Sequence, residues 1–143
     1  MSVKVSDILK DKGLEVIALD SNASVDTAVR KMAERNIGAV LITEQGNFVG
    51  MFTERDVIKC WAGNGSFIDV LLKDVMSKSI RVAEPDNDLE YVMTIMSHER
   101  IRHLPIIDRG KMVGLVSMRD LVKYHIGNLE AEVHYLKDYM LRS

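Results

Sequence analysis

Two short segments of this sequence carry side chains that suit the binding of a sugar phosphate. The first, residues 50–56, reads GMFTERD, and the second, residues 114–120, reads GLVSMRD. Each ends in an arginine followed by an aspartate, Arg55-Asp56 and Arg119-Asp120. A carboxylate accepts two hydrogen bonds at once, which suits the neighbouring 2′- and 3′-hydroxyls of a ribose, and a guanidinium holds phosphate. Together these side chains predict a site for a phosphorylated ribose.

A hydroxyl residue precedes each of these pairs, Thr53 in the first segment and Ser117 in the second. Where a strand ends and a helix begins, such a residue caps the helix, and the N–H groups of the first turn attract phosphate. A second interpretation needs no ligand, because acidic residues favour the first turn of any helix. The occurrence of glycine, hydroxyl, arginine and aspartate at the same spacing in both segments favours the binding interpretation.

The two segments belong to a longer internal repeat. Residues 16–60 align without a gap on residues 80–124, and 9 of the 45 aligned pairs are identical. Upstream of each copy, VSDIL at residues 5–9 resembles LKDVM at residues 72–76. This duplication predicts two copies of one structural unit, and therefore ligand sites in pairs.

Each copy has the pattern of a small unit of mixed α and β structure. Ser24 and Asp88 are good N-cap residues, and apolar residues follow each of them at the i, i+3, i+4, i+7 spacing of an amphipathic helix. Two apolar runs on either side of a turn that ends in Gly46 or Gly110 predict a β-hairpin. A second helix follows each hairpin.

A short strand is expected ahead of these elements, at Val16–Leu19 and at Ile80–Ala83, so each copy reads β-α-β-β-α. A three-stranded sheet with two helices buries its apolar face poorly by itself. We therefore expect an α+β fold in which the two copies pack sheet to sheet about a pseudo-two-fold axis and leave two related clefts.

This repeated arrangement resembles a pair of CBS motifs, also called a Bateman module, of the stand-alone bacterial type. The resemblance rests on the pattern Gly-apolar-apolar-Thr/Ser-x-x-Asp after a helix and a hairpin, occurring twice, and it covers about residues 3–126. It implies a first motif with its leading helix at residues 1–70, a second motif at 71–126 and a C-terminal helix at 127–143. It also implies two clefts that bind AMP, ADP, ATP, NADH or S-adenosylmethionine as regulatory ligands.

The same resemblance implies a role for each predicted site residue. The motif aspartates hold ribose, the hydroxyl residues lie beside ribose or phosphate, the first strand flanks the adenine, and the segment entering the second strand lines the cleft. With the two arginines, the predicted ligand-binding residues are Ile17, Ala18, Gly38, Ala39, Thr53, Arg55, Asp56, Arg81, Val82, Arg102, His103, Leu104, Ser117, Arg119 and Asp120.

The two predicted clefts differ in charge. The second copy has Arg102 and His103 where the first has Gly38 and Ala39. We therefore expect the cleft that contains Asp120 to hold the more highly charged phosphate group.

Composition and motif content argue against several other classes of protein. The formal net charge of −2 gives no electrostatic case for nucleic acid or an anionic membrane, and no apolar run reaches the roughly 18 residues of a membrane span. The single cysteine, Cys60, rules out an intramolecular disulfide, and the scattered histidines lack metal-ligand spacing. We therefore expect a cytoplasmic protein that binds an adenosine nucleotide, holds no metal and is not an enzyme.

Two other functions stay open. A scaffold would use the same fold for protein contacts without nucleotide. An enzyme is less favoured. IMP dehydrogenase carries such a motif pair as a regulatory insert, but the catalytic barrel of that enzyme does not fit in 143 residues. If the protein is a regulatory module, an unidentified protein that it regulates is a further expected partner.

The C-terminal segment continues the last predicted helix. Its apolar residues follow the 3, 4, 3, 4 spacing of a coiled-coil seam: Ile126, Leu129, Val133, Leu136 and Met140. About 15 residues form a marginal helix alone, so this segment must pack against something. Two possibilities remain, the protein's own body and a second copy in a homodimer.

Overall fold

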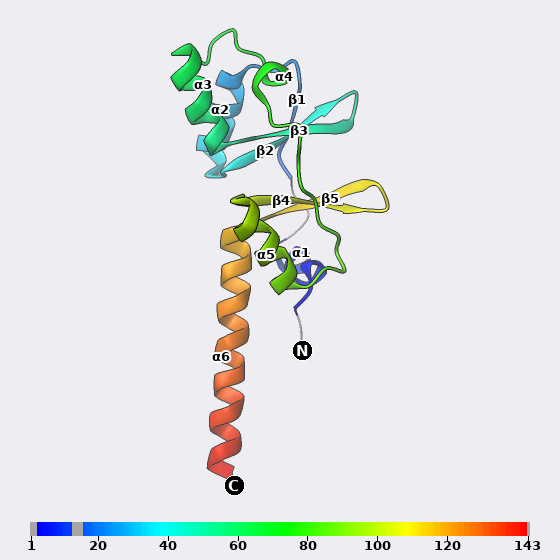
Figure 1. Ribbon diagram of the computed structural model, residues 1–143, viewed down its shortest axis with the longest axis vertical. Helices are drawn as coiled ribbons and strands as arrows, with labels where there is room; N and C mark the ends of the chain where they lie inside the picture. Colours follow the sequence, from blue (N-terminus) through cyan, green and yellow to red (C-terminus); the bar gives the residue numbers. More distant parts are fainter. Residues whose placement is uncertain (1–2, 13–15, 143) are drawn as a thin grey trace. The chain divides into compact units, whose positions relative to one another are not determined.

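The computed structural model describes residues 3–12 and 16–142 and has the mixed α+β architecture that the repeat predicts (Figure 1). In chain order its elements are α1 (Val5–Lys12), β1 (Ala18–Asp20), α2 (Val25–Arg35), β2 (Ala39–Glu44), β3 (Asn47–Thr53), α3 (Glu54–Asn64), α4 (Leu72–Val75), α5 (Leu89–Glu99), β4 (His103–Asp108), β5 (Lys111–Ser117) and α6 (Met118–Arg142).

The described chain divides into two compact units. The three-stranded unit ends at Arg81, and the two-stranded unit combines α1 with the chain from Val82 onward. The helix in front of each repeat therefore packs in the unit of the other repeat. Helix α1 precedes the first repeat but contributes to the core around β4 and β5, whereas α4 precedes the second repeat and contributes to the core around β2 and β3.

The three-stranded unit has the strand order β1-β2-β3, in which β1 runs parallel to β2 and β2 runs antiparallel to β3. Helix α2 begins at the predicted cap, where the Ser24 hydroxyl accepts a hydrogen bond from the Thr27 N–H at 3.1 Å. The apolar face of α2 packs on one face of the sheet. Its core is made of Val25, Ala28, Met32, Val40, Ile42, Phe52, Cys60 and Leu72.

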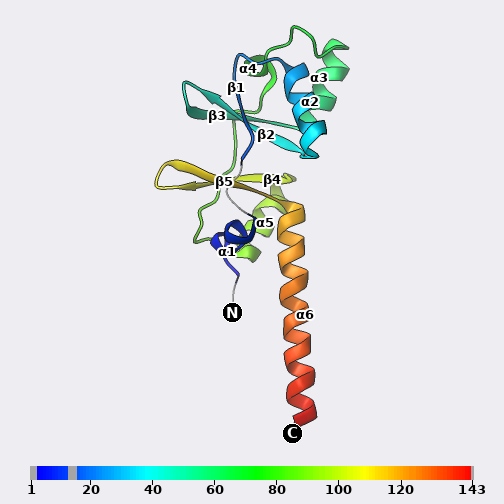
Figure 2. The same ribbon diagram turned by 180° about the vertical axis from the view of Figure 1, so that it is seen from behind.

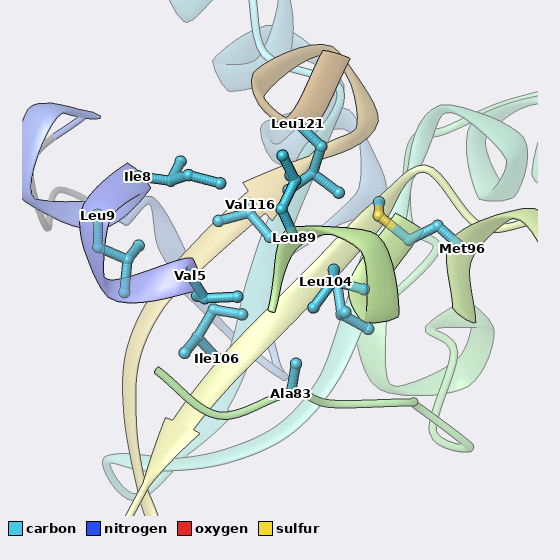
Figure 3. Packing of buried hydrophobic residues seen from close by; sticks show 11 residues of the cluster. Val5, Ile8, Leu9, Ala83, Leu89, Met96, Leu104, Ile106, Val116 and Leu121 are labelled. Atoms are coloured by element: carbon cyan, nitrogen blue, oxygen red, sulfur yellow. The ribbon is translucent and has the colours of Figure 1, made fainter. Parts of the chain in front are cut away.

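The two-stranded unit consists of the antiparallel hairpin β4–β5 with α1, α5 and α6 (Figure 3). Alternation along the strands turns Leu104, Ile106 and Val116 toward the helices, where they meet residues of α1, α5 and α6. Helix α1 contributes Val5, Ile8 and Leu9 to this core, as Figure 3 shows.

Both hairpins have the turn that the glycines predict. Gln45 and Gly46 have φ values of 51° and 82°, and Arg109 and Gly110 have φ values of 53° and 79°. Two successive residues with positive φ are the signature of a type I′ turn, which matches the right-handed twist of the strands.

The prediction of a strand at Ile80–Ala83 was wrong. In the second repeat this strand is reduced to an isolated parallel bridge between Ala83 and Ile106, whereas β1 of the first repeat makes a ladder. In the first repeat the Leu41 N–H donates to the Ile17 carbonyl at 3.0 Å. At the other end of that ladder the Ser21 N–H donates to the Thr43 carbonyl at 2.9 Å. The residues equivalent to Leu41 and Ser21 are Pro105 and Pro85, and neither has an N–H to donate, so the ladder is lost on both sides of the Ala83–Ile106 bridge.

Helix α6 is a single helix of 25 residues. It begins where the second repeat predicts and continues without a break through the C-terminal segment, well past the other elements of its own unit (Figures 1 and 2). The apolar seam residues of this segment are all exposed in the chain. The possibility that the segment packs against its own body is therefore not the arrangement found.

Candidate functional site

In the three-stranded unit, the predicted site residues gather where β2 begins and β3 ends. Ala39 pairs with Thr53 across the hairpin, and the Glu54 N–H donates to the Gly38 carbonyl at 3.1 Å. Because β1 runs parallel to β2, Ile17 and Ala18 lie beside the first half of β2. Ile17 and Ala18 thus lie at the same end of the sheet as Thr53, although more than thirty positions separate them in the sequence.

The carboxylate of Asp56 is already engaged in hydrogen bonds at this end. Its Oδ2 accepts from the Thr53 N–H at 2.9 Å and from the Thr53 hydroxyl at 3.2 Å. The Ser77 hydroxyl lies 3.1 Å from Oδ1 and 3.2 Å from Oδ2. With these partners Asp56 is only 7% exposed, so its acceptor positions serve the protein's own fold.

A close backbone approach brings Ser77 to this carboxylate. The Met51 N–H donates to the Ser77 carbonyl at 3.0 Å, and the Ser77 N–H donates to the Met51 carbonyl at 2.9 Å. Gly50 makes room for this segment, since a Cβ at that position would lie 2.7 Å from Met76 Sδ and 3.0 Å from the Ser77 carbonyl oxygen. At Gly50 the requirement for glycine is therefore steric.

In the two-stranded unit the equivalent aspartate forms a reciprocal capping box. The Ser117 N–H donates to Asp120 Oδ2 at 2.9 Å, and the Asp120 N–H donates to the Ser117 hydroxyl at 3.1 Å. His103 pairs with Ser117 across the hairpin, and the Met118 N–H donates to the Arg102 carbonyl at 2.8 Å. The expectation of a capped helix start is thus met, whether or not a ligand is also bound.

Asp120 also lines a cavity within the two-stranded unit. The cavity has a volume of about 540 Å³, and its walls are Val3, Ile8, Asp11, Asp120, Lys123, Tyr124 and Gly127. It lies between α1 and the first turns of α6, and it combines two carboxylates, an ammonium and a phenol with apolar side chains.

A hydrogen bond joins the two helices at this cavity. The Tyr124 hydroxyl donates to Asp11 Oδ2. Desolvation, followed by this hydrogen bond, raises the pKa of Tyr124 to about 12, and the negative charges of Asp11, Asp7 and Asp120 act in the same direction. The phenol is therefore neutral, and it remains a donor to Asp11 throughout the physiological pH range.

The remaining predicted residues differ in accessibility. Arg55, Arg81 and Arg119 are exposed, whereas the side chain of Leu104 is fully buried in the core of its unit. Only the backbone of Leu104 is therefore available to a ligand. Arg81 and Val82, which the resemblance assigns to the adenine of one cleft, are the last and first residues of different units.

Sequence reasoning missed four residues at these sites. Ser77 lies 21 positions from Asp56, and no local pattern links them. Lys123 and Tyr124 continue α6 beyond the motif, and Asp11 comes from the helix that precedes the first repeat. The likeness between residues 5–9 and 72–76 was the one signal that these leading segments have equivalent structural roles.

A family comparison identifies the repeat. The CBS-domain family model matches the chain twice, at residues 5–63 and 72–127. The protein belongs to the CBS-domain family. The resemblance inferred from the repeated glycine-to-aspartate pattern is thereby confirmed, as are the two tandem motifs.

Known CBS-domain proteins resemble this chain over most of its length. A CBS-domain-containing protein of Bacillus subtilis, YhcV, is 31% identical over 82% of this chain and 84% of its own. The crystal structure of the CBS domain NE2398 shares 36% identity, with a TM-score of 0.84 over 88% of this chain and 99% of its own. The CBS-domain protein ATU1752 of Agrobacterium tumefaciens shares 32% identity, with a TM-score of 0.82 over 86% of this chain and 93% of its own.

Ligands are present in structures of one similar protein. The CBS domain pair of protein MJ0100 was solved in complex with methylthioadenosine and S-adenosylmethionine. It is 26% identical to this chain, with a TM-score of 0.79 over 90% of this chain and 99% of its own.

Two kinds of feature are absent from the part of the chain that the structure describes. None of the helices among residues 3–12 and 16–142 is both long and apolar enough to cross a bilayer. In the same part of the chain, no group of three or more histidine, cysteine or acidic side chains is placed to hold a metal ion.

Proposed function

We propose that this CBS-domain protein is a regulatory module that binds an adenosine ligand (AMP, ADP, ATP, NADH or S-adenosylmethionine) and that it is not an enzyme. Support comes from its family, and from MJ0100, whose CBS domain pair binds two adenosine derivatives. The proposed module is a cytoplasmic homodimer that passes ligand occupancy to a regulated protein. Such a response requires that the ligand bind two states of the module with different affinity.

The cavity beside Asp120 is the observation that carries this proposal. Its volume of about 540 Å³ lies within the roughly 300–1,000 Å³ of small-molecule sites. The Asp120 carboxylate suits a ribose diol, and the Lys123 ammonium suits a phosphate. The ring of Tyr124 offers a flat apolar face to a base, while its hydroxyl is held by Asp11.

The two motif aspartates are proposed to differ in ligand binding. A ribose at Asp56 would have to displace the Ser77 hydroxyl, which lies within 3.2 Å of both carboxylate oxygens. Asp120 lines a cavity of ligand size, and Lys123 on the wall of the same cavity adds a positive charge. We therefore expect the Asp120 site to fill first and to prefer the more highly charged phosphate group.

Thermal unfolding of the full chain with each candidate ligand tests this proposal. A ligand at 100 times its dissociation constant adds about 2.7 kcal/mol of stability, which raises the Tm by about 5–10 °C for a protein of this size. Asp120→Asn should abolish the shift. Asp56→Asn is the matched control, and it should lower the Tm without ligand yet keep most of the shift.

Two other outcomes of the unfolding experiment would contradict the proposal or part of it. If no adenosine compound shifts the Tm, the module is a scaffold for protein contacts and the ligand proposal fails. If Asp56→Asn abolishes the shift and Asp120→Asn does not, a ligand binds but the assignment of the two aspartates is reversed.

A further inference from the structure

The C-terminal half of α6 presents an apolar stripe that its own unit does not cover. The stripe residues are between 45% and 73% exposed, and they are Ile126, Leu129, Val133, Leu136 and Met140. A shallow groove of about 340 Å³ runs along this side of the helix, lined by Ile126, Leu129, Glu130, Val133, His134 and Lys137. A regular stripe of this kind on a soluble helix marks a contact surface.

The types of residue along the stripe identify the kind of contact. Assigned to a heptad, Ile126, Val133 and Met140 occupy position a, and Leu129 and Leu136 occupy position d. In parallel coiled coils, β-branched residues at a, here Ile126 and Val133, with leucine at d favour two strands over higher oligomers. The stripe is therefore suited to one further helix of the same kind.

The charges beside the stripe complement a second copy of the chain. In a parallel in-register pair, a residue at position g faces the residue at position e that lies five positions later in the other helix. Glu132 at g then faces Lys137 of the second copy. The two-fold symmetry of a homodimer forms this pair twice.

The antiparallel alternative has the opposite charge pattern. An arrangement that pairs Ile126 with Leu136 and Leu129 with Val133 brings Glu132 opposite Glu132 and Glu130 opposite Glu130. Like charges at these flanking positions disfavour it.

The folded body prepares α6 for this contact. An isolated helix of about 15 residues is marginal because its first turn is costly to form. Here that turn is already formed, since the capping box of Ser117 and Asp120 starts α6 and Leu121 anchors it in the core. The stripe from residue 126 to residue 140 extends a helix that exists, over a length of about 21 Å.

We propose that α6 of two copies forms a parallel, in-register, two-stranded coiled coil through Ile126, Leu129, Val133, Leu136 and Met140. The contact gives the homodimer a defined two-fold axis along α6. It does not depend on nucleotide binding, so its test is separate from that of the ligand proposal.

Sedimentation equilibrium of the full chain tests the contact. We expect a dimer whose dissociation constant rises at least tenfold in Leu136→Glu. Tyr135→Glu is the matched control, because Tyr135 is 68% exposed on the same turn but lies outside the stripe, and it should leave the dimer unchanged. Circular dichroism confirms that both variants remain folded. A monomeric wild type, a dimer that survives Leu136→Glu, or equal losses in both variants overturns the proposal.

Two further variants test the orientation. Leu136→Cys should form an intermolecular disulfide on mild oxidation, because position d meets position d only in the parallel in-register pair. Glu132→Lys should weaken the dimer several-fold, and Glu132→Lys with Lys137→Glu should restore it by reversing both charges. A dimer that forms no such disulfide, or that the second change does not restore, is not the parallel coiled coil.

Discussion

Gly50 and Gly114 occupy equivalent positions in the two repeats, yet their surroundings differ in a way that predicts different costs for the same substitution. A Cβ at Gly50 would lie 2.7 Å from Met76 Sδ and 3.0 Å from the Ser77 carbonyl oxygen. A Cβ at Gly114 would lie 2.7 Å from Leu9 Cδ2, and the next nearest atom, Leu9 Cδ1, would be 3.5 Å away. Neither glycine has the positive φ that would itself disfavour alanine.

These contacts set the expected magnitudes. The Ser77 carbonyl is held in the backbone pair with Met51, so at Gly50 the alanine methyl forces the main chain to move, and such overpacking costs about 1–3 kcal/mol. Replacing glycine by alanine returns about 0.4–1 kcal/mol through the unfolded state. Gly50→Ala should therefore destabilise the protein by about 1–2 kcal/mol. At Gly114 only a flexible leucine methyl must move, so Gly114→Ala should stay within about 0.5 kcal/mol of the wild type.

Urea unfolding of the two variants measures this difference. The one tryptophan of the chain, Trp61, lies in α3 and packs on Phe67 with ring centroids 5.3 Å apart, so its fluorescence reports on the three-stranded unit that contains Gly50. Far-UV circular dichroism reports on both units. With a slope of about 1–2 kcal/mol per molar urea, Gly50→Ala should lower the midpoint by about 1 M. Equal losses in the two variants, or a larger loss in Gly114→Ala, would refute the steric argument.

The other predictions concern hydrogen bonds and the composition of the units. Ser77→Ala removes a hydroxyl donor from a buried carboxylate and should cost about 1.5–3 kcal/mol in urea unfolding followed by Trp61 fluorescence, while Ser77→Thr should recover part of the loss. Because the pKa of Tyr124 is raised, its neutral form stabilises the fold fully below pH about 10, and that contribution is lost as the pH rises through about 12. Asp11→Asn should lower this pKa, which phenolate absorbance measures against a Tyr124→Phe reference, and an unchanged titration would contradict the assigned contact. A fragment of residues 16–81 should be more stable to urea than a fragment of residues 1–70, since only the former includes the buried Leu72; the reverse order would contradict the division into units.

Local patterns predicted the elements of this fold because local interactions determine them. The Ser24 cap, the two hairpin turns and the helix starts at Thr53 and Ser117 each depend on residues within about four positions of one another. The missing strand in the second repeat depends on two prolines, Pro85 and Pro105, but the effect of Pro105 appears only when the parallel partner is known.

The candidate site was less predictable because its contacts are formed between distant segments. The motif identified Asp56 and Asp120, but it did not show that Ser77 engages one of them or that Asp11 and Tyr124 meet beside the other. Nor did it show that the side chain of Leu104 is directed into the core. Each of these facts depends on which unit a leading helix joins, and the order of the repeats in the chain does not reveal this.

The packing of each leading helix in the unit of the other repeat has a consequence for how such a chain arises by duplication. A precursor with a single repeat would have had no other repeat in its own chain to receive its leading helix. Two precursor chains could each have supplied that helix to the other, which makes the precursor a domain-swapped homodimer. Fusion of the two genes would then have joined the partners covalently and turned an exchange between subunits into the crossed packing of α1 and α4.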